Sequence, residues 1–127
     1  METEKFIQLV QGALLNGNAK TATRADILQI IEAILNTLSE VLQPKQIRQL
    51  AATLPPDIGQ YLLQRGGSEP DTLNEFFYFV AAREGTSLAH AIHHSRTVIS
   101  VLQEAVPGYV LQMIQEQLPH EFAPLFQ

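Results

Sequence analysis

The amino-acid sequence predicts an all-α protein, a compact helical bundle built from two pseudo-symmetric helical repeats. Every long periodic segment spaces its apolar residues three and four positions apart, and strand-like alternation is absent over any useful length. Residues 38–63 also align with residues 102–127 at a constant offset of 64 without a gap. One copy could hardly cover its own apolar faces, so we expect the two copies to pack around a pseudo-two-fold axis.

The first repeat, residues 3–65, opens with two predicted helices. We expect the first helix to run from Thr3, its predicted N-cap, to about Leu15, where Asn and Gly residues stop it. The second begins near Thr23, because Thr23 and Asp26 resemble a capping box. Its apolar face is wide, which is typical of a helix deep in a bundle.

Prolines mark the rest of this repeat. Pro44 suits the first turn of a third helix, where its missing N–H costs nothing. Pro55 and Pro56 end that helix, since proline cannot continue the backbone hydrogen-bond ladder. Residues 57–64 should then form a short fourth helical piece.

The second repeat, residues 71–127, follows the same scheme after a joint near residues 66–70. Asp71 or Thr72 should cap its first helix, and Ser87 should cap a long helix ending near Ala105. Pro107 begins the next helix. A break at Leu118-Pro119 and a last partial turn over 121–126 complete the repeat, and we expect residues 1–127 to form a single domain.

Composition excludes several classes of function. The net charge is −5 and the eight basic residues are scattered, which argues against nucleic-acid binding. The absence of cysteine removes disulfides, thiolate metal sites and cysteine nucleophiles, and fits a reducing compartment. We find no secretory signal and no run of about 18 apolar residues for a membrane helix. We therefore expect a soluble, cytoplasmic protein that does not bind membranes.

Each repeat closes with a Leu-Pro corner. The first reads Leu54-Pro55-Pro56-Asp57-Ile58, and the second reads Leu118-Pro119-His120-Glu121-Phe122. In these corners, in the helices that precede them and in the run from His94 to Leu102, the chain resembles the bacterial domain of unknown function 2267 family. The resemblance spans almost the whole chain and implies an all-α fold and a bacterial setting. It supplies no catalytic residues and no cofactor.

Three histidines form the most suggestive cluster of chemical groups. His90, His93 and His94 lie at helical spacings that place imidazoles on neighbouring turns, as a metal site on a helix requires. On a helical wheel, however, His90 and His93 point away from the apolar face, and His94 lies on its shoulder. Three interpretations stay open, which are exposed histidines on a polar face, a metal site at the surface or at an interface, and a pH-sensitive contact.

The run Phe76-Phe77-Tyr78-Phe79 points all round its helix, so at least one of these rings should be exposed. We expect Phe76, Phe77 and Phe79 to pack in the core, and we name Phe76 and Tyr78 as candidates for an interface.

No pair of carboxylates shows an acid–base arrangement, and we place Glu32, Glu40 and Glu104 on polar helix faces. No nucleophile motif or phosphate-binding loop is visible. The sequence therefore favours a non-enzymatic protein-interaction or regulatory module, which acts on a protein partner or on itself as a homodimer. One alternative is a metal-binding protein or metal-dependent enzyme that uses the three histidines. A weaker alternative is a sensor of a small apolar ligand held between the repeats.

Overall fold

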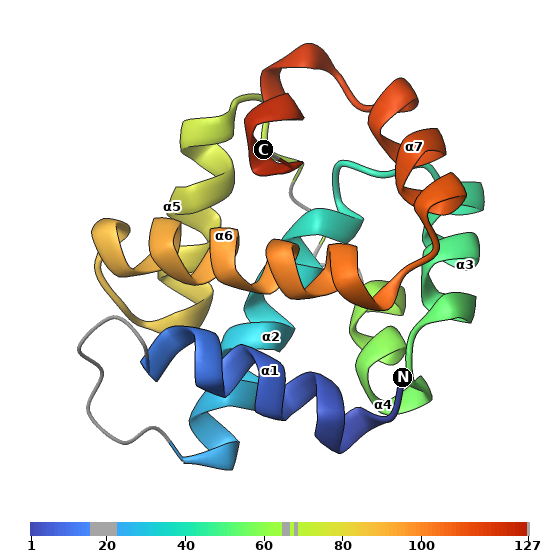
Figure 1. Ribbon diagram of the computed structural model, residues 1–127. Helices are drawn as coiled ribbons and strands as arrows, with labels where there is room; N and C mark the ends of the chain where they lie inside the picture. Colours follow the sequence, from blue (N-terminus) through green and yellow to red (C-terminus); the bar gives the residue numbers. More distant parts are fainter. Residues whose placement is uncertain (16–22, 65–66, 68, 127) are drawn as a thin grey trace.

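The computed structural model describes residues 1–15, 23–64, 67 and 69–126. Within these residues every regular element is helical and no strand occurs, which confirms the predicted all-α class. The predicted stop at residues 16–18, the long connection from Asn16 to Ala22, and residues 66 and 68 of the joint near 66–70 lie outside the described residues (Figure 1).

The first half of the chain forms the predicted series of helical pieces. Thr23 and Asp26 make the predicted capping box, in which the Thr23 hydroxyl accepts a hydrogen bond from the Asp26 N–H and the Asp26 carboxylate accepts one from the Thr23 N–H. Pro44 is the first residue of its helix, and Pro56 begins the next piece. The elements are α1 (Thr3–Leu15), α2 (Arg24–Ser39), α3 (Pro44–Thr53), α4 (Pro56–Gly59) and the 3-10 helix η1 (Gln60–Leu63).

The predicted cap of α1 is wrong. Thr3 is the first residue of α1 itself, and the Glu2 carbonyl accepts the hydrogen bond from the Phe6 N–H. The Thr3 hydroxyl instead donates to the Asp57 carboxylate, 3.5 Å away, and so links the start of α1 to α4.

The second half also follows the prediction. Thr72 caps the first helix through the Glu75 N–H, and Ser87 caps the long helix through the His90 N–H. Pro107 is the residue before the next helix rather than its first residue. The elements are α5 (Leu73–Glu84), α6 (Leu88–Ala105), α7 (Gly108–Gln117) and the 3-10 helix η2 (His120–Phe126).

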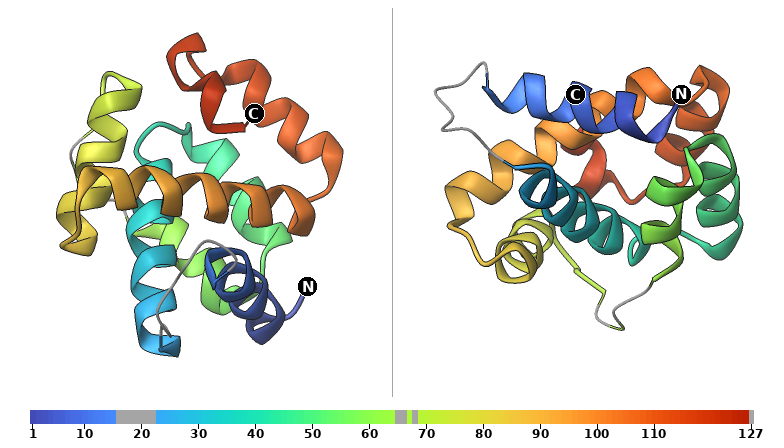
Figure 2. Two further views of the ribbon diagram at one scale, coloured as in Figure 1. Left: turned by 60° about the vertical axis from the view of Figure 1, so that its left-hand side comes forward. Right: turned by 90° about the horizontal axis from the view of Figure 1, so that it is seen from below.

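The two long helices α2 and α6 form the centre of the bundle. In Figure 1, α6 crosses the front of the molecule and α2 passes behind it, and Figure 2 shows the same crossing from two other sides. The contacts between the halves are reciprocal, because α1 packs against α6 and α5 packs against α2. The pseudo-two-fold relationship between the repeats, and their exact boundaries, remain a prediction.

A single core of buried apolar side chains joins both halves. Burial of one Leu, Ile or Phe side chain stabilises the fold by about 1.5–3 kcal/mol, so this core is the main favourable contribution. The largest fully buried side chains are Phe6, Ile27, Ile31, Ile34, Leu35, Leu38, Leu50, Ile58, Leu62, Phe76, Ile99 and Leu102.

Three side chains lie elsewhere than the sequence predicts. Glu40 is buried with 3% of its surface exposed, although we expected it on a polar face, because α5 brings Arg83 against it. Leu88 is 37% exposed at the first turn of α6, more than its apolar side chain would suggest. Phe79, expected in the core, is half-buried beneath the Arg83 guanidinium, which lies 5.8 Å from the ring centroid.

Candidate functional site

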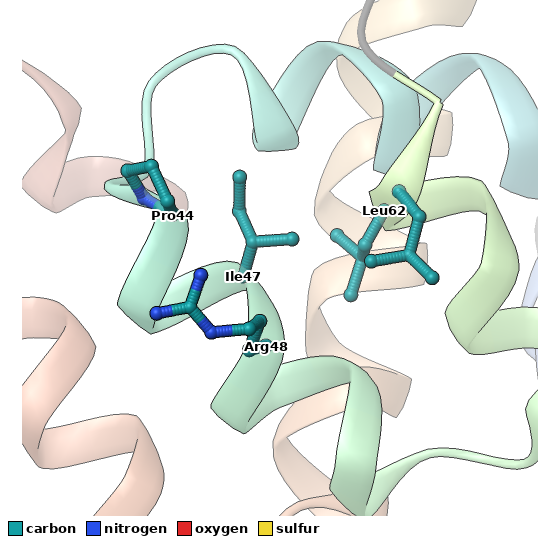
Figure 3. A pocket seen from close by; sticks show the side chains of 5 residues that line it. Pro44, Ile47, Arg48 and Leu62 are labelled. Carbon is teal, nitrogen blue, oxygen red and sulfur yellow. The ribbon is translucent and has the colours of Figure 1, made fainter.

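The Leu-Pro corner of the first repeat forms a small apolar hollow between α3 and η1. The Pro55 carbonyl accepts hydrogen bonds from the N–H groups of Ile58 and Gly59, at 2.9 and 2.8 Å, which turns the chain back alongside α3. The hollow that results has a volume of about 180 Å³ (Figure 3). Its lining residues are Pro44, Ile47, Arg48, Leu62 and Leu63.

This α3–η1 hollow has an apolar floor and a basic rim. Ile47 and Leu62 are buried, whereas Leu63 is 62% exposed, which is unusual for a leucine at the edge of an apolar hollow. Arg48 is exposed at the opposite edge and forms no ion pair within the described residues. Lys45 is one residue beyond Pro44 on the same helix, and α3 contains no acidic residue, so this face is basic on an acidic protein.

The α3–η1 hollow was not predicted from the sequence. The signal was present in Leu62-Leu63, because two consecutive leucines on a helical turn cannot both face the core. The basic helix in a chain of net charge −5 was a second signal. Neither feature shows that α3 and η1 lie side by side, and that arrangement creates the hollow.

The corner of the second repeat has a different shape. A hollow of about 200 Å³ lies between α7 and η2, lined by Gln115, Leu118, His120, Ala123 and Phe126. Ala123 is 64 positions after Gly59. A Cβ on Gly59 would lie 2.9 Å from the Ala51 carbonyl oxygen, so glycine allows the first corner to close more tightly against its helix. The corners share a motif, and their surfaces differ.

The four aromatic rings of residues 76–79 point to different sides of α5, so they differ in burial. Phe76 is completely buried, in edge-to-face contact with Phe77 at 5.9 Å and with Phe122 at 6.4 Å between ring centroids. Tyr78 is 59% exposed on the outside of α5. Of the two residues predicted for an interface, Tyr78 is therefore the one at the surface, and its role there remains a prediction.

A polar cluster lies where α5 turns into α6. Gly85 ends α5 in the left-handed conformation, at φ 71°, and its N–H and that of Thr86 both donate to the Ala81 carbonyl. This tight reversal places the Glu84 carboxylate 2.7 Å from Nδ1 of His94. The Glu84 side chain is 4% exposed and the His94 side chain 18%, so the pair is largely shielded from water.

The three histidines lie together on the outer side of this cluster. The His90 ring stacks on the His94 ring with 6.0 Å between centroids and 12° between planes, and the His93 ring is tilted at 6.1 Å. His90 and His93 are exposed and His94 is half-buried, as the helical wheel predicts. No group of three or more His, Cys, Asp or Glu side chains in the described part of the chain is arranged to hold a metal ion.

A second ion pair ties α5 to the end of α2. Arg83 pairs with the buried Glu40 carboxylate and donates to the Thr37 hydroxyl at 2.7 Å. Thr37 is itself buried and donates to the Ala33 carbonyl. A cation at the C-terminal end of α2 also interacts favourably with the helix dipole. This ion pair therefore holds α5 against the C-terminal end of α2.

The structure also places a hollow between the two repeats. Its volume is about 280 Å³, and α1 and α6 line it through Gln8, Leu9, Gly12, Ala13, Ser100, Val101 and Glu104. Small-molecule sites usually start near 300 Å³, so this hollow is at the lower limit for the predicted apolar-ligand sensor. That function remains a prediction.

The family of this chain follows from its match to a known family model. Residues 3–125 match the model of the family described as "Uncharacterized conserved protein (DUF2267)". The chain belongs to this family, domain of unknown function 2267, which confirms the predicted resemblance. Comparison with curated proteins gives no match. Among the described residues, no helix is long and apolar enough to cross a membrane.

Proposed function

We propose that this protein is a non-enzymatic interaction module that binds a partner protein through the α3–η1 hollow. The observation that carries this proposal is the exposed Leu63 beside a hollow whose floor is apolar. Full burial of a leucine stabilises by about 1.5–3 kcal/mol, and a partner that covers Leu63 can recover more than half of this, because the side chain is 62% exposed.

The chemistry of the rim indicates the class of partner. Arg48 and Lys45 extend from α3 with no acidic residue on that helix. A partner segment that fits would place an apolar side chain against Ile47 and Leu62 and a carboxylate next to Arg48 (Figure 3). With a volume of about 180 Å³, the hollow accommodates one or two such side chains rather than a whole ligand of drug size.

A second copy of this acidic chain also meets this description, so self-association needs its own measurement. Light scattering of the purified protein distinguishes the two cases, because a homodimer doubles the mass. If the partner is another protein, the isolated chain stays a monomer and binds only when that protein is added.

Differential capture tests the surface itself. The wild-type chain and the variants Leu63→Ser, Arg48→Glu and Tyr109→Ser serve as baits. Tyr109 is the matched control, because it is 76% exposed at the start of α7 and lies 64 positions after Lys45. We expect one partner to be retained by the wild type and by Tyr109→Ser and lost with the other two variants. A partner retained by all four baits contradicts the proposal.

A further inference from the structure

We propose that His90 and His94 form a two-histidine site for a divalent transition metal. Glu84 does not bind the metal but holds the His94 ring, and water completes the coordination. The inference is independent of the α3–η1 hollow, because α3, which lines that hollow, lies on the opposite side of the molecule from the α5–α6 turn (Figure 1). It also narrows the predicted three-histidine cluster to two ligands and gives the third histidine no role.

The first support is the way each ring is held. Nδ1 of His94 is bonded to Glu84 Oε1 at 2.7 Å, and Nδ1 of His90 lies 3.3 Å from the Thr86 hydroxyl. Both bonds use Nδ1, and no described residue forms a hydrogen bond with Nε2 of either ring, so both Nε2 atoms are available to a metal. A histidine that gives Nδ1–H to a carboxylate and Nε2 to a metal is the usual arrangement around protein-bound zinc, because the carboxylate fixes the tautomer and raises the basicity of the ring.

The second support is the relative position of the rings. His90 and His94 are one helical turn apart, and their planes differ by only 12°. Both Nδ1 atoms bond toward the α5–α6 turn, where Glu84 and Thr86 lie, so both Nε2 atoms point away from that turn. His93 is adjacent to His94 in sequence, so it projects about 100° away around the helix and does not share this direction.

The third support is the buried carboxylate. The second oxygen of Glu84, Oε2, is buried and accepts no hydrogen bond within the described residues. A buried carboxylate is costly unless a positive charge compensates it. A dication on Nε2 of His94 would supply that charge one ring away.

Metal binding requires one small movement. Imidazole nitrogens bind zinc at about 2.0–2.1 Å, whereas the ring centroids are 6.0 Å apart, so the rings must converge at their Nε2 edges. His90 is able to move, because it is exposed and one 3.3 Å hydrogen bond is all that holds its ring among the described residues. His94 stays in place against Glu84. Two imidazoles with open water positions suit Cu²⁺ and Zn²⁺, and Cu²⁺ should bind more tightly.

The test uses the untagged full-length chain, stripped of metal, with CuCl₂ and ZnCl₂ as probes. Calorimetry should show one Cu²⁺ per chain, and electron paramagnetic resonance should show two nitrogen ligands. The variants are His90→Ala, His93→Ala and Glu84→Gln, each checked for folding by circular dichroism. His93→Ala is the matched control, because it removes an exposed histidine from the same helix.

We expect His90→Ala to weaken binding at least tenfold and His93→Ala to change it less than twofold. Removal of an outer-shell partner costs about 10–100-fold in metal affinity, so Glu84→Gln should weaken binding by that factor. The proposal is overturned if the wild type binds no Cu²⁺ at one per chain, or if His90→Ala binds as tightly as the wild type. Equal losses in His90→Ala and His93→Ala also overturn it, because they would indicate a three-histidine site.

Discussion

Gly59 lies so close to Ala51 that a Cβ added to it would come within 2.9 Å of the Ala51 carbonyl oxygen. The φ of Gly59 is −58°, an ordinary helical value, so space rather than backbone conformation requires glycine here. The contact holds α4 against α3 and thereby sets the position of η1, which forms one side of the α3–η1 hollow.

Gly59→Ala should therefore destabilise the protein. Overpacking costs about 1–3 kcal/mol, and the better helix propensity of alanine offsets about 1 kcal/mol, so we expect a net loss of about 1 kcal/mol in urea unfolding. Gly12→Ala is the matched control, because Gly12 is an exposed helical glycine whose added Cβ meets nothing within 4 Å. That variant should gain up to about 1 kcal/mol. Changes of the same sign in both variants contradict this explanation.

Leu62 and Leu63 provide a second matched pair. Leu62 is fully buried, so Leu62→Ala should cost about 2–5 kcal/mol in the free energy of unfolding. Leu63 is 62% exposed, and Leu63→Ser should leave the stability within about 0.5 kcal/mol while it removes partner binding. Thermal and urea melts of the two variants measure the difference. A large loss of stability in Leu63→Ser would show that Leu63 serves the fold rather than an interface.

The Arg83–Glu40 pair should be asymmetric under mutation. Arg83→Met removes the guanidinium that pairs with the Glu40 carboxylate, which is 3% exposed. Loss of one partner from a fully buried pair costs about 3–5 kcal/mol, and since the Arg83 side chain is 26% exposed we expect about 2–3 kcal/mol.

Two further variants test this account of the pair. The double variant Arg83→Met with Glu40→Gln should recover part of the loss, because it removes the buried charge. Arg24→Met breaks the exposed pair with Glu4, in which both side chains are more than half exposed, and should have a much smaller effect. If Arg24→Met and Arg83→Met lose equal stability, burial is not the cause.

The capping box of α2 should make stability depend on acid. Two hydrogen bonds hold the pKa of Asp26 below its ordinary value of 3.8: the one from the Thr23 N–H has the larger effect, and the one from the Thr23 hydroxyl has the smaller effect. A pKa lowered by folding means that the ionised carboxylate stabilises the fold above pH 3.8, and that this contribution disappears as the pH falls through the lowered value.

Asp26→Asn keeps an oxygen acceptor for the cap and removes this titration. The Tm of the variant should lie below that of the wild type at neutral pH, and the difference should shrink toward about pH 2. Thr23→Ala removes only the contribution of the hydroxyl to the lowered pKa of Asp26. Its Tm should therefore also lie below that of the wild type at neutral pH, and this difference should shrink less in acid than it does for Asp26→Asn. A Tm difference that is constant with pH would exclude the charge of Asp26 as the cause.

Local rules were sufficient to place most of the helices. Thr23 with Asp26, Thr72 with Glu75, and the prolines at 44, 55 and 56 act within a few residues of where they stand, so their effects are visible in sequence. The exception at Thr3 has a non-local cause, because its hydroxyl donates to Asp57 on α4, 54 residues away, instead of capping its own helix.

The candidate sites depended on contacts that sequence patterns do not report. Spacing along α6 brought His90 and His94 to neighbouring turns, but the carboxylate that holds His94 comes from α5 across a left-handed turn. Glutamate is usually a surface residue, and the burial of Glu40 became visible only in the structure, where Arg83 of α5 lies against it. Leu63 could be identified as exposed only once η1 was seen beside α3.

The sequence by itself determined the all-α class, the order of the helices, most of their caps and the family, because apolar periodicity and capping are local properties of the chain. Tertiary structure decided which polar groups are buried and which apolar groups stay in water. The repeat at offset 64 specifies two similar corners, yet one glycine in place of alanine and one neighbouring helix give them different surfaces. Those surfaces depend on distances between segments remote in sequence, and the packing of α2, α5 and α6 sets these distances.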